Sequence, residues 1–392
     1  MKFFLFLLFI FVINFSQAQL HGGFNSEEAK EMIQLCNSFT YLELFNSDKD
    51  IIPKGYTKIY TSPVLGMDNR FQIYTKGKAA VINFRGSTDK KQSWMENVHS
   101  AIIPAIGRIE IKDKTFKYKF ARDTVAGVHA GYALGLAYLH EELLHQIKLL
   151  NKKGIYQIYI TGHSQGGSLA ILARAYLGYL PHHKLNKKNK FKVYTFAQPM
   201  VGNIEFTQEY DSKYSDKGMS YSMINKADLV PKMPISYNDT TFWRSHLGKI
   251  LSKEEKLNKT AMFKEGMTLL FQRKLQGINE KFGKSVEKQI EKELGEITLP
   301  DPKKEINYSQ VGNLIILPSP QYPLAMKDPA LLNNREFMAN HPRDKNGVFE
   351  DKSVYKKTSV SQNHKPYNYY TSVLQVYFPE EYNRVEPKLF GL

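Results

Sequence analysis

The chain has 392 residues, of which 42% are hydrophobic and 13% aromatic, so it fits one large domain or two ordinary ones and is not disordered throughout. The formal net charge of +16 favours polyanionic partners such as anionic lipid surfaces, whereas no pattern of a nucleic-acid-binding module occurs, so nucleic acid is not an expected partner. The single cysteine, Cys36, excludes an internal disulfide and is expected to be a small buried hydrophobe.

The first residues have the features of a secretory signal peptide. One lysine precedes an apolar run from Phe3 to Val12, and small residues at Ser16 and Ala18 form a cleavage signal. We therefore expect residues 1–18 to be removed and the protein to be secreted, periplasmic or held at the cell surface. The alternative is an uncleaved membrane anchor, for which the run is shorter than the roughly 20 apolar residues that span a bilayer.

Strand-like and helix-like patterns alternate through the first half of the chain. Short apolar runs rich in β-branched and aromatic residues, alternating with helices, indicate an α/β fold with a largely parallel central sheet covered on both faces. We treat residues 19–392 as a single domain. The expected strands are 56–62, 71–75, 79–86, 155–161, 191–197 and 219–225, and the expected helices are 26–44, 127–152, 165–179 and 205–214.

A segment at about 236–305 interrupts this alternation. Its apolar residues recur at spacings of three and four with Lys and Glu between them, which predicts an amphipathic helix or helical hairpin. This segment either packs its apolar stripe on the domain or serves as a lid or interface-binding helix. A strand at 309–317 follows it, and the tail over 318–392 is typical of long loops with a short helix near 367–376.

The stretch GHSQG, residues 162–166, lies between an apolar strand and a helix. Glycines on both sides of Ser164 permit a sharp turn that presents the serine hydroxyl at the carboxyl edge of the sheet. The N–H groups at the start of the following helix suit an oxyanion. This context favours a nucleophilic serine over a structural turn.

A serine nucleophile needs a histidine base and a carboxylate that orients it. Asp228 follows a predicted strand, where the acid is expected, although a surface turn would also explain it. Of the three histidines after Asp228, His246 opens the inserted segment, His341 lies in a polar loop and His364 precedes a predicted amphipathic helix. His163, next to the nucleophile, is too local to be the base and is expected to pack beneath the turn.

Six motifs, in this order and spacing, resemble those of the class 3, fungal-type lipases. The resemblance extends over about 25–235 and 306–376, and it implies an α/β-hydrolase fold and an activity that needs no cofactor. The helical segment at about 236–305 is larger than expected for the family. The motifs are VINFRGST (81–88), VHAGY (128–132), TGHSQGGSLA (161–170), YTFAQPMVGN (194–203), INKADLVPKMP (224–234) and NHKPYNYY (363–370).

The resemblance assigns roles to individual residues. Ser164 would be the nucleophile, Asp228 the orienting acid and His364 the base, the last because a tyrosine five residues further on, Tyr369, belongs to the family pattern. The first oxyanion donor would be Ser87, which follows Arg-Gly.

The second oxyanion donor would be the backbone N–H of Gln165. The chain departs from the family here, because members usually carry leucine after the nucleophile. It also has Met200 where many members have arginine, and Asn363 where an acid often precedes the histidine. These departures leave the acyl preference open.

In the relatives, a short helix after the RGS turn acts as a lid. Its counterpart here is 89–104, where Trp94, Met95 and Val98 are spaced to form one apolar face. Either a lid that opens at lipid surfaces or a plain amphipathic surface helix fits this pattern.

The pattern as a whole predicts an exported serine hydrolase that cleaves carboxylic esters, with acylglycerols as the first substrate class and peripheral contact with anionic lipid surfaces. Phospholipase A1 and feruloyl or acetyl esterase activities fit the same fold. A catalytically silent lipid- or glycan-binding protein is the alternative from another class. No His, Asp or Glu cluster has metal-ligand spacing, so neither a metal nor an organic cofactor is expected.

Overall fold

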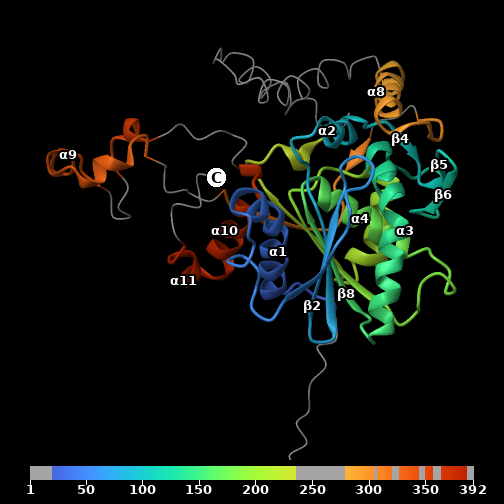
Figure 1. The fold of residues 1–392 in the computed structure, drawn as a ribbon, viewed down its shortest axis with the longest axis horizontal. Coiled ribbons are helices and arrows are strands. Elements are labelled where there is room, and N and C mark those ends of the chain that lie inside the picture. Colours follow the sequence, from blue (N-terminus) through green and yellow to red (C-terminus); the bar gives the residue numbers. More distant parts are fainter. Residues whose placement is uncertain are drawn as a thin grey trace, which may run out of the picture.

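A seven-stranded mixed sheet runs through the centre of the molecule (Figure 1). Its strand order is β1-β2-β3-β8-β9-β11-β14. The strands from β3 to β14 pair in parallel, whereas β1 and β2 add an antiparallel edge. The largely parallel sheet predicted from the sequence is therefore confirmed. The strands are β1 (Thr57–Thr61), β2 (Phe71–Lys76), β3 (Ala79–Phe84), β8 (Gln157–His163), β9 (Lys190–Phe196), β11 (Ser220–Asn225) and β14 (Asn313–Leu317).

The structure is a computed structural model, and it describes residues 20–234, 279–303, 307–319, 326–343, 349–355 and 363–385. The expected signal peptide at 1–18, His246 and most of the expected helical segment at 236–305 lie outside the described residues. Within the described ranges, no helix is both long enough and apolar enough to cross a bilayer.

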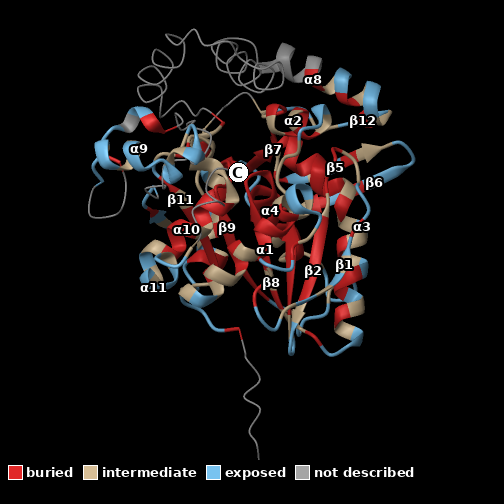
Figure 2. Cartoon of the chain, turned by 60° about the vertical axis from the view of Figure 1, so that its left-hand side comes forward, coloured by how far each residue is buried: buried red, intermediate tan, exposed pale blue. Residues whose placement is uncertain are grey.

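Helices cover both faces of the sheet and bury a separate layer on each side (Figures 1 and 2). Side chains alternate along β3, because successive residues of a strand point to opposite faces. Ile82 packs in the layer under α3 and α4, whereas Val81 packs in the layer under α1 and α10. The covering helices are α1 (Ser26–Phe45), α3 (Ala130–Lys152), α4 (Gln165–Leu177) and α10 (Pro366–Tyr377).

The ends of these helices follow local sequence signals. The Asn25 side chain caps α1 by accepting from the N–H of Glu28 at 3.0 Å. Pro366 starts α10, where its missing N–H costs nothing. The expected helix at 127–152 begins only at Ala130, because residues 127–129 form a short strand of another sheet.

Two small sheets, which the sequence analysis did not predict, stand beside the central one. A four-stranded sheet has the order β13-β10-β7-β4, and a three-stranded antiparallel sheet has the order β12-β5-β6. Their strands are β4 (Ile102–Pro104), β5 (Ile106–Ile111), β6 (Lys114–Lys119), β7 (Gly127–His129), β10 (Gly202–Asn203), β12 (Ile297–Thr298) and β13 (Tyr308–Ser309).

The described part of the 236–305 segment packs on the domain. Helix α8 (Asn279–Leu294) buries Val286 and Ile290 in the same core layer as α3 and α4. Strand β12 then pairs with β5, with Ile297 opposite Ile111. Of the two interpretations of this segment, the described residues match the helix that packs its apolar stripe on the domain.

Two further expectations change in detail. The expected strand at 309–317 is divided between β13 and β14 by Gly312, whose φ of 92° requires glycine. The expected lid helix at 89–104 is only α2 (Lys91–Val98), because its last residues form β4. The remaining α-helices of the described ranges are α5 (Ile204–Tyr210), α9 (Arg335–Asn340) and α11 (Pro379–Tyr382).

Candidate active site

The turn that carries Ser164 connects β8 to α4 and is built by its glycines. Ser164 has φ 57° and ψ −132°, a strained conformation for a residue other than glycine. A Cβ atom on Gly162 would lie 2.2 Å from the carbonyl oxygen of Gly166, and one on Gly166 would lie 2.3 Å from that of Phe84. Only glycine fits at both positions, and this tight turn between a parallel strand and a helix has the geometry of a nucleophile elbow.

The structure brings Ser164, His364 and Asp228 together from distant parts of the chain. Nε2 of His364 lies 2.8 Å from Oγ of Ser164, and its Nδ1 lies 2.8 Å from Oδ2 of Asp228. Ser164 is 8% exposed and Asp228 is 1% exposed. An imidazole in this position can take the serine proton, while the carboxylate holds the ring in the required tautomer and stabilises the imidazolium.

The buried carboxylate of Asp228 has further donors. The hydroxyl of Tyr369 donates to Oδ2 at 2.7 Å, and the backbone N–H of Val230 donates to Oδ1 at 2.9 Å. The Tyr369 hydroxyl in turn accepts from the N–H of Asn225 at 3.0 Å. Both carboxylate oxygens are therefore paired, as a buried charge requires. The contact between Tyr369 and Asp228 was not predicted from the sequence, where Tyr369 serves only to distinguish His364 from the other histidines.

His163 is buried beside the three residues. Its ring centroid lies 4.9 Å from that of His364 and 5.6 Å from that of Tyr369. Burial, with the nearby His364 as a lesser cause, holds the pKa of His163 well below its usual value. His163 is therefore neutral near pH 7, and it packs beneath the turn as expected.

His341 lies elsewhere. It follows α9, its Nδ1 is 2.9 Å from the carbonyl oxygen of Phe337, and its ring stacks on Phe337 with centroids 3.9 Å apart. Of the histidines after Asp228 that the structure describes, His364 is the one within hydrogen-bond distance of Ser164.

The loop that follows β3 passes beside the elbow. Phe84 at the end of β3 lies opposite Gly162 of β8 in the parallel register. A Cβ atom on Gly86 would be 2.9 Å from the carbonyl oxygen of His163, so glycine is needed for this close approach. Ser87, the next residue, donates from its hydroxyl to Oε1 of Gln165 at 2.9 Å. Both residues expected at the oxyanion site therefore lie in contact.

Asp68 anchors the loop that follows β3 by accepting hydrogen bonds from three of its side chains. Arg85 donates to Oδ2 at 2.9 Å, Thr88 to Oδ2 at 2.6 Å and Lys90 to Oδ1 at 2.8 Å. Burial alone would raise the pKa of Asp68, but these hydrogen bonds and the charge of Arg85 hold it below the usual value. The residues on both sides of Ser87 are thus anchored to one carboxylate.

Helix α2 covers this loop. Met95 and Val98 are buried in the main core, whereas Trp94 is only half-buried. The outer side of α2 meets α8, where Gln92 donates to Glu293 at 3.2 Å and Lys91 lies 3.6 Å from the same carboxylate. Of the three apolar residues predicted for a lid, Met95 and Val98 thus face the core in this structure.

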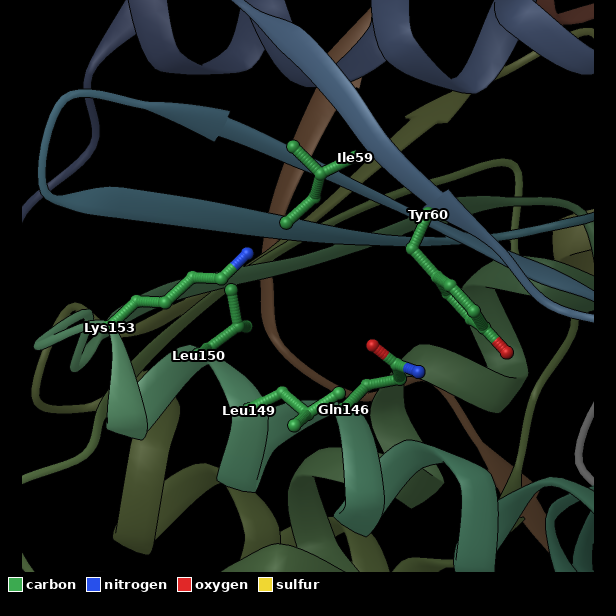
Figure 3. A pocket seen from close by; sticks show the side chains of 6 residues that line it. All are labelled: Ile59, Tyr60, Gln146, Leu149, Leu150 and Lys153. Atoms are coloured by element: carbon green, nitrogen blue, oxygen red, sulfur yellow. The ribbon is translucent and has the colours of Figure 1, made fainter.

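A separate pocket lies at the opposite edge of the sheet. Lys153 of its lining precedes β8, whereas Ser164 follows that strand, so the pocket is not part of the serine site. It lies between β1 and the C-terminal half of α3 and is lined by Ile59, Tyr60, Gln146, Leu149, Leu150 and Lys153 (Figure 3). Among the described residues, no group of three or more His, Cys, Asp or Glu side chains could hold a metal ion.

Comparison with protein families finds that residues 81–238 match the family described as Lipase (class 3). Lipase ZK262.3 of Caenorhabditis elegans is 38% identical over 87 residues, which are 22% of this chain and 23% of the relative. Triacylglycerol lipase OBL1 of Arabidopsis thaliana is 28% identical over 203 residues, which are 46% and 38% of the two chains.

Secreted mono- and diacylglycerol lipase 1 of Fusarium solani is 27% identical over 152 residues, which are 36% of this chain and 41% of the relative. The chain thus spans less than half the length of each of these curated relatives. Among solved structures, a fungal lipase-inhibitor complex matches with a TM-score of 0.42 and 20% identity, covering 54% of this chain and 74% of the other.

Proposed function

We propose that the protein, whose residues 81–238 match the family described as Lipase (class 3), is a serine hydrolase that cleaves carboxylic esters, with acylglycerols as its substrates. The observation that carries the proposal is the pair of 2.8 Å contacts that link Ser164, His364 and Asp228. This pair supplies a base for the serine proton and an orienting acid for the base.

The reaction follows from these contacts in two halves. His364 takes the proton of Ser164 as Oγ attacks the ester carbonyl, and the carbonyl oxygen becomes an oxyanion between Ser87 and the N–H of Gln165. The intermediate collapses, the C–O bond breaks, and the alcohol leaves with the proton from His364. Water then attacks the acyl-enzyme with His364 as base, which releases the carboxylic acid and restores Ser164.

Acylglycerols are proposed because two relatives are named for that substrate class, one a triacylglycerol lipase and one a mono- and diacylglycerol lipase. Phospholipase A1 and feruloyl or acetyl esterase activities remain outcomes of the substrate test. The sequence pattern of residues 1–18 and the secreted relative support export. The net charge of +16 would concentrate the protein at anionic lipid surfaces, where α2 is our candidate for a lid.

The test is hydrolysis of butyrate, octanoate and palmitate esters, and of emulsified triacylglycerol and phospholipid, by the mature chain. We expect Ser164→Ala and His364→Ala each to lower kcat by about 10⁴-fold or more. Ser212→Ala and His145→Ala, which change the same residue types at exposed positions, are the matched controls and should retain activity.

A preference for short or aromatic acyl groups would replace the acylglycerol assignment with an esterase. If a fluorophosphonate fails to label Ser164 and the wild type leaves every ester intact, the hydrolase proposal is wrong, and the silent binding protein becomes the better interpretation. Activity that survives in His364→Ala but not in Ser164→Ala would remove His364 from the role of base.

A further inference from the structure

The side chain of Gln165 lies at the centre of a buried hydrogen-bond network beside Ser164. Its Oε1 accepts from Asn97 at 2.8 Å, from Ser87 at 2.9 Å and from Ser93 at 3.2 Å. Its Nε2 donates to Oδ1 of Asn69 at 3.0 Å. The residue is 1% exposed. One amide thus joins the elbow to the Ser87 loop, to α2 and to the turn before β2.

The network determines which groups donate. The hydroxyl of Tyr132 donates to Oδ1 of Asn97 at 3.0 Å. The Nδ2 group of Asn97 therefore points away from Tyr132. Nδ2 lies within hydrogen-bond distance of three acceptors, Oε1 of Gln165, Oγ of Ser87 at 2.9 Å and the carbonyl oxygen of Ser93 at 3.0 Å, so one of its two protons is shared between two of them. Because Ser87 already accepts a hydrogen bond, its own proton is the one directed at Gln165.

We infer that the side chain of Gln165 is a positioning residue for the oxyanion site, because its carbonyl holds the hydroxyl of Ser87 ready to donate. The inference rests on the proposed function, since it requires an oxyanion to form beside Ser164. As that charge develops, the Ser87 proton turns from Oε1 of Gln165 to the oxyanion, and no covalent bond of Ser87 changes.

When the Ser87 proton turns to the oxyanion, no buried acceptor is left without a hydrogen bond. Oε1 of Gln165 keeps Asn97 and Ser93 as donors when the Ser87 proton turns away. Asn97 keeps its hydrogen bond to Oγ of Ser87, which fixes the oxygen while the proton moves. The alignment is therefore set before the reaction begins, as electrostatic preorganisation requires.

Glycines of α3 make room for the residues beside this network. Asn69 donates from Nδ2 to the buried carboxyl of Glu96 at 2.5 Å. A Cβ atom on Gly135 of α3 would lie 2.4 Å from that carboxyl, and one on Gly131 would lie 1.9 Å from the carbonyl oxygen of Glu96. Glycine at both positions lets α2 approach α3. A leucine at position 165, usual in the family, would leave Asn69, Ser93 and Asn97 without this shared partner.

The test uses Gln165→Met, which has a similar length but no acceptor at Oε1, both alone and combined with Ser87→Ala, which lacks the hydroxyl. The backbone N–H of residue 165 is present in both. Gln146→Met is the matched control, since Gln146 is a buried glutamine of α3 in the pocket lining at the far edge of the sheet. Rates are normalised to the fraction of protein that a fluorophosphonate labels.

We expect Gln165→Met to lower kcat by about 10²-fold with KM within about twofold, because the loss of one oxyanion donor costs about 10² to 10³. Binding of a trifluoromethyl ketone, whose adduct carries the oxyanion, should weaken by the same factor as kcat/KM. In the Ser87→Ala background Gln165→Met should cost little further activity, because the hydroxyl that it positions is absent, and Gln146→Met should match the wild type.

A merely structural role gives a different result. If Gln165→Met lowers the melting temperature but keeps the wild-type kcat per labelled site, the inference is overturned while the hydrolase proposal stands. It is also overturned if Gln165→Met costs as much activity in the Ser87→Ala background as it does in the wild type. A wild type that is neither labelled nor active overturns both the inference and the proposed function.

Discussion

The hydroxyl of Tyr369 donates a hydrogen bond to Oδ2 of Asp228 at 2.7 Å. The same oxygen faces Nδ1 of His364 at 2.8 Å. Tyr369 belongs to α10 and Asp228 follows β11, so this contact joins one of the last helices of the chain to the central sheet. The contact therefore fixes the position of the carboxylate oxygen that orients the imidazole.

Tyr369→Phe should therefore reduce catalysis without abolishing it. We expect kcat to fall about tenfold, because misplacement of a reacting group costs up to about 10²-fold. The free energy of unfolding should fall by about 1–3 kcal/mol, since the N–H of Asn225 loses its buried partner. Ester kinetics and urea unfolding measure the two effects. Tyr370→Phe, the same change at the next residue, is the control; equal kinetics in both variants would contradict the assignment.

The glycines of the elbow should tolerate no side chain. In Gly166→Ala the new Cβ would meet the carbonyl oxygen of Phe84 at 2.3 Å, so β3 or the elbow has to move. We expect the free energy of unfolding to fall by more than about 2 kcal/mol, together with loss of labelling at Ser164. Gly77→Ala, where φ is 57° but no atom lies within 4 Å, separates backbone strain from the clash and should cost about 1–2 kcal/mol. If urea unfolding shows that Gly166→Ala and Gly77→Ala lose the same free energy of unfolding, a steric clash is not the cause of the loss in Gly166→Ala.

The elbow could be predicted from sequence because its signals are local. The glycines around Ser164, the apolar strand before it and the helix after it all lie within one short stretch, and each has a physical reason visible in the residue types. Asp228 could be placed because it follows a strand. The choice of His364 over His341 needed the family resemblance, since both lie in polar loops and residue type alone does not separate them.

The network around Gln165 could not be predicted. Asn69, Ser87 and Asn97 come from separate segments, and their contact with Gln165 depends on the register of β3 against β8 and on how α2 docks on α3. The sequence marks position 165 only as a departure from the family. The small sheets were missed for a related reason: strands as short as β10 carry no alternation long enough to recognise.

Asp228→Asn tests the role of the orienting acid with little change in shape. An amide at this position favours the wrong tautomer of His364, so we expect kcat to fall by about 10³ to 10⁴-fold. KM should change little, because Asp228 does not reach the substrate site. Steady-state kinetics and the rate of fluorophosphonate labelling check this, with exposed Asp216→Asn as the control. A variant that keeps the wild-type kcat would exclude Asp228 as the acid.

Glu96 should make stability depend on pH. Burial raises the pKa of its carboxyl from 4.5 to about 8, although hydrogen bonds from Asn69 and Gln165 lower it in part. These partners are neutral, and so is Tyr132 of α3, whose pKa is raised by burial and by Glu96. Between about pH 4.5 and pH 8 the folded chain thus holds a proton that the unfolded chain releases.

The contribution of Glu96 is therefore fully present below about pH 4.5 and is lost as the pH rises to about 8, with a slope of up to about 1.4 kcal/mol per pH unit. Glu96→Gln keeps an acceptor for Asn69 and does not ionise, so we expect it to remove this slope and to be more stable than the wild type at pH 8. Urea unfolding at pH 5, 6, 7 and 8 measures this, with exposed Glu336→Gln as the control. Parallel pH profiles for wild type and Glu96→Gln would show that the carboxyl is ionised throughout, and the charge would then have to be accommodated between α2 and α3.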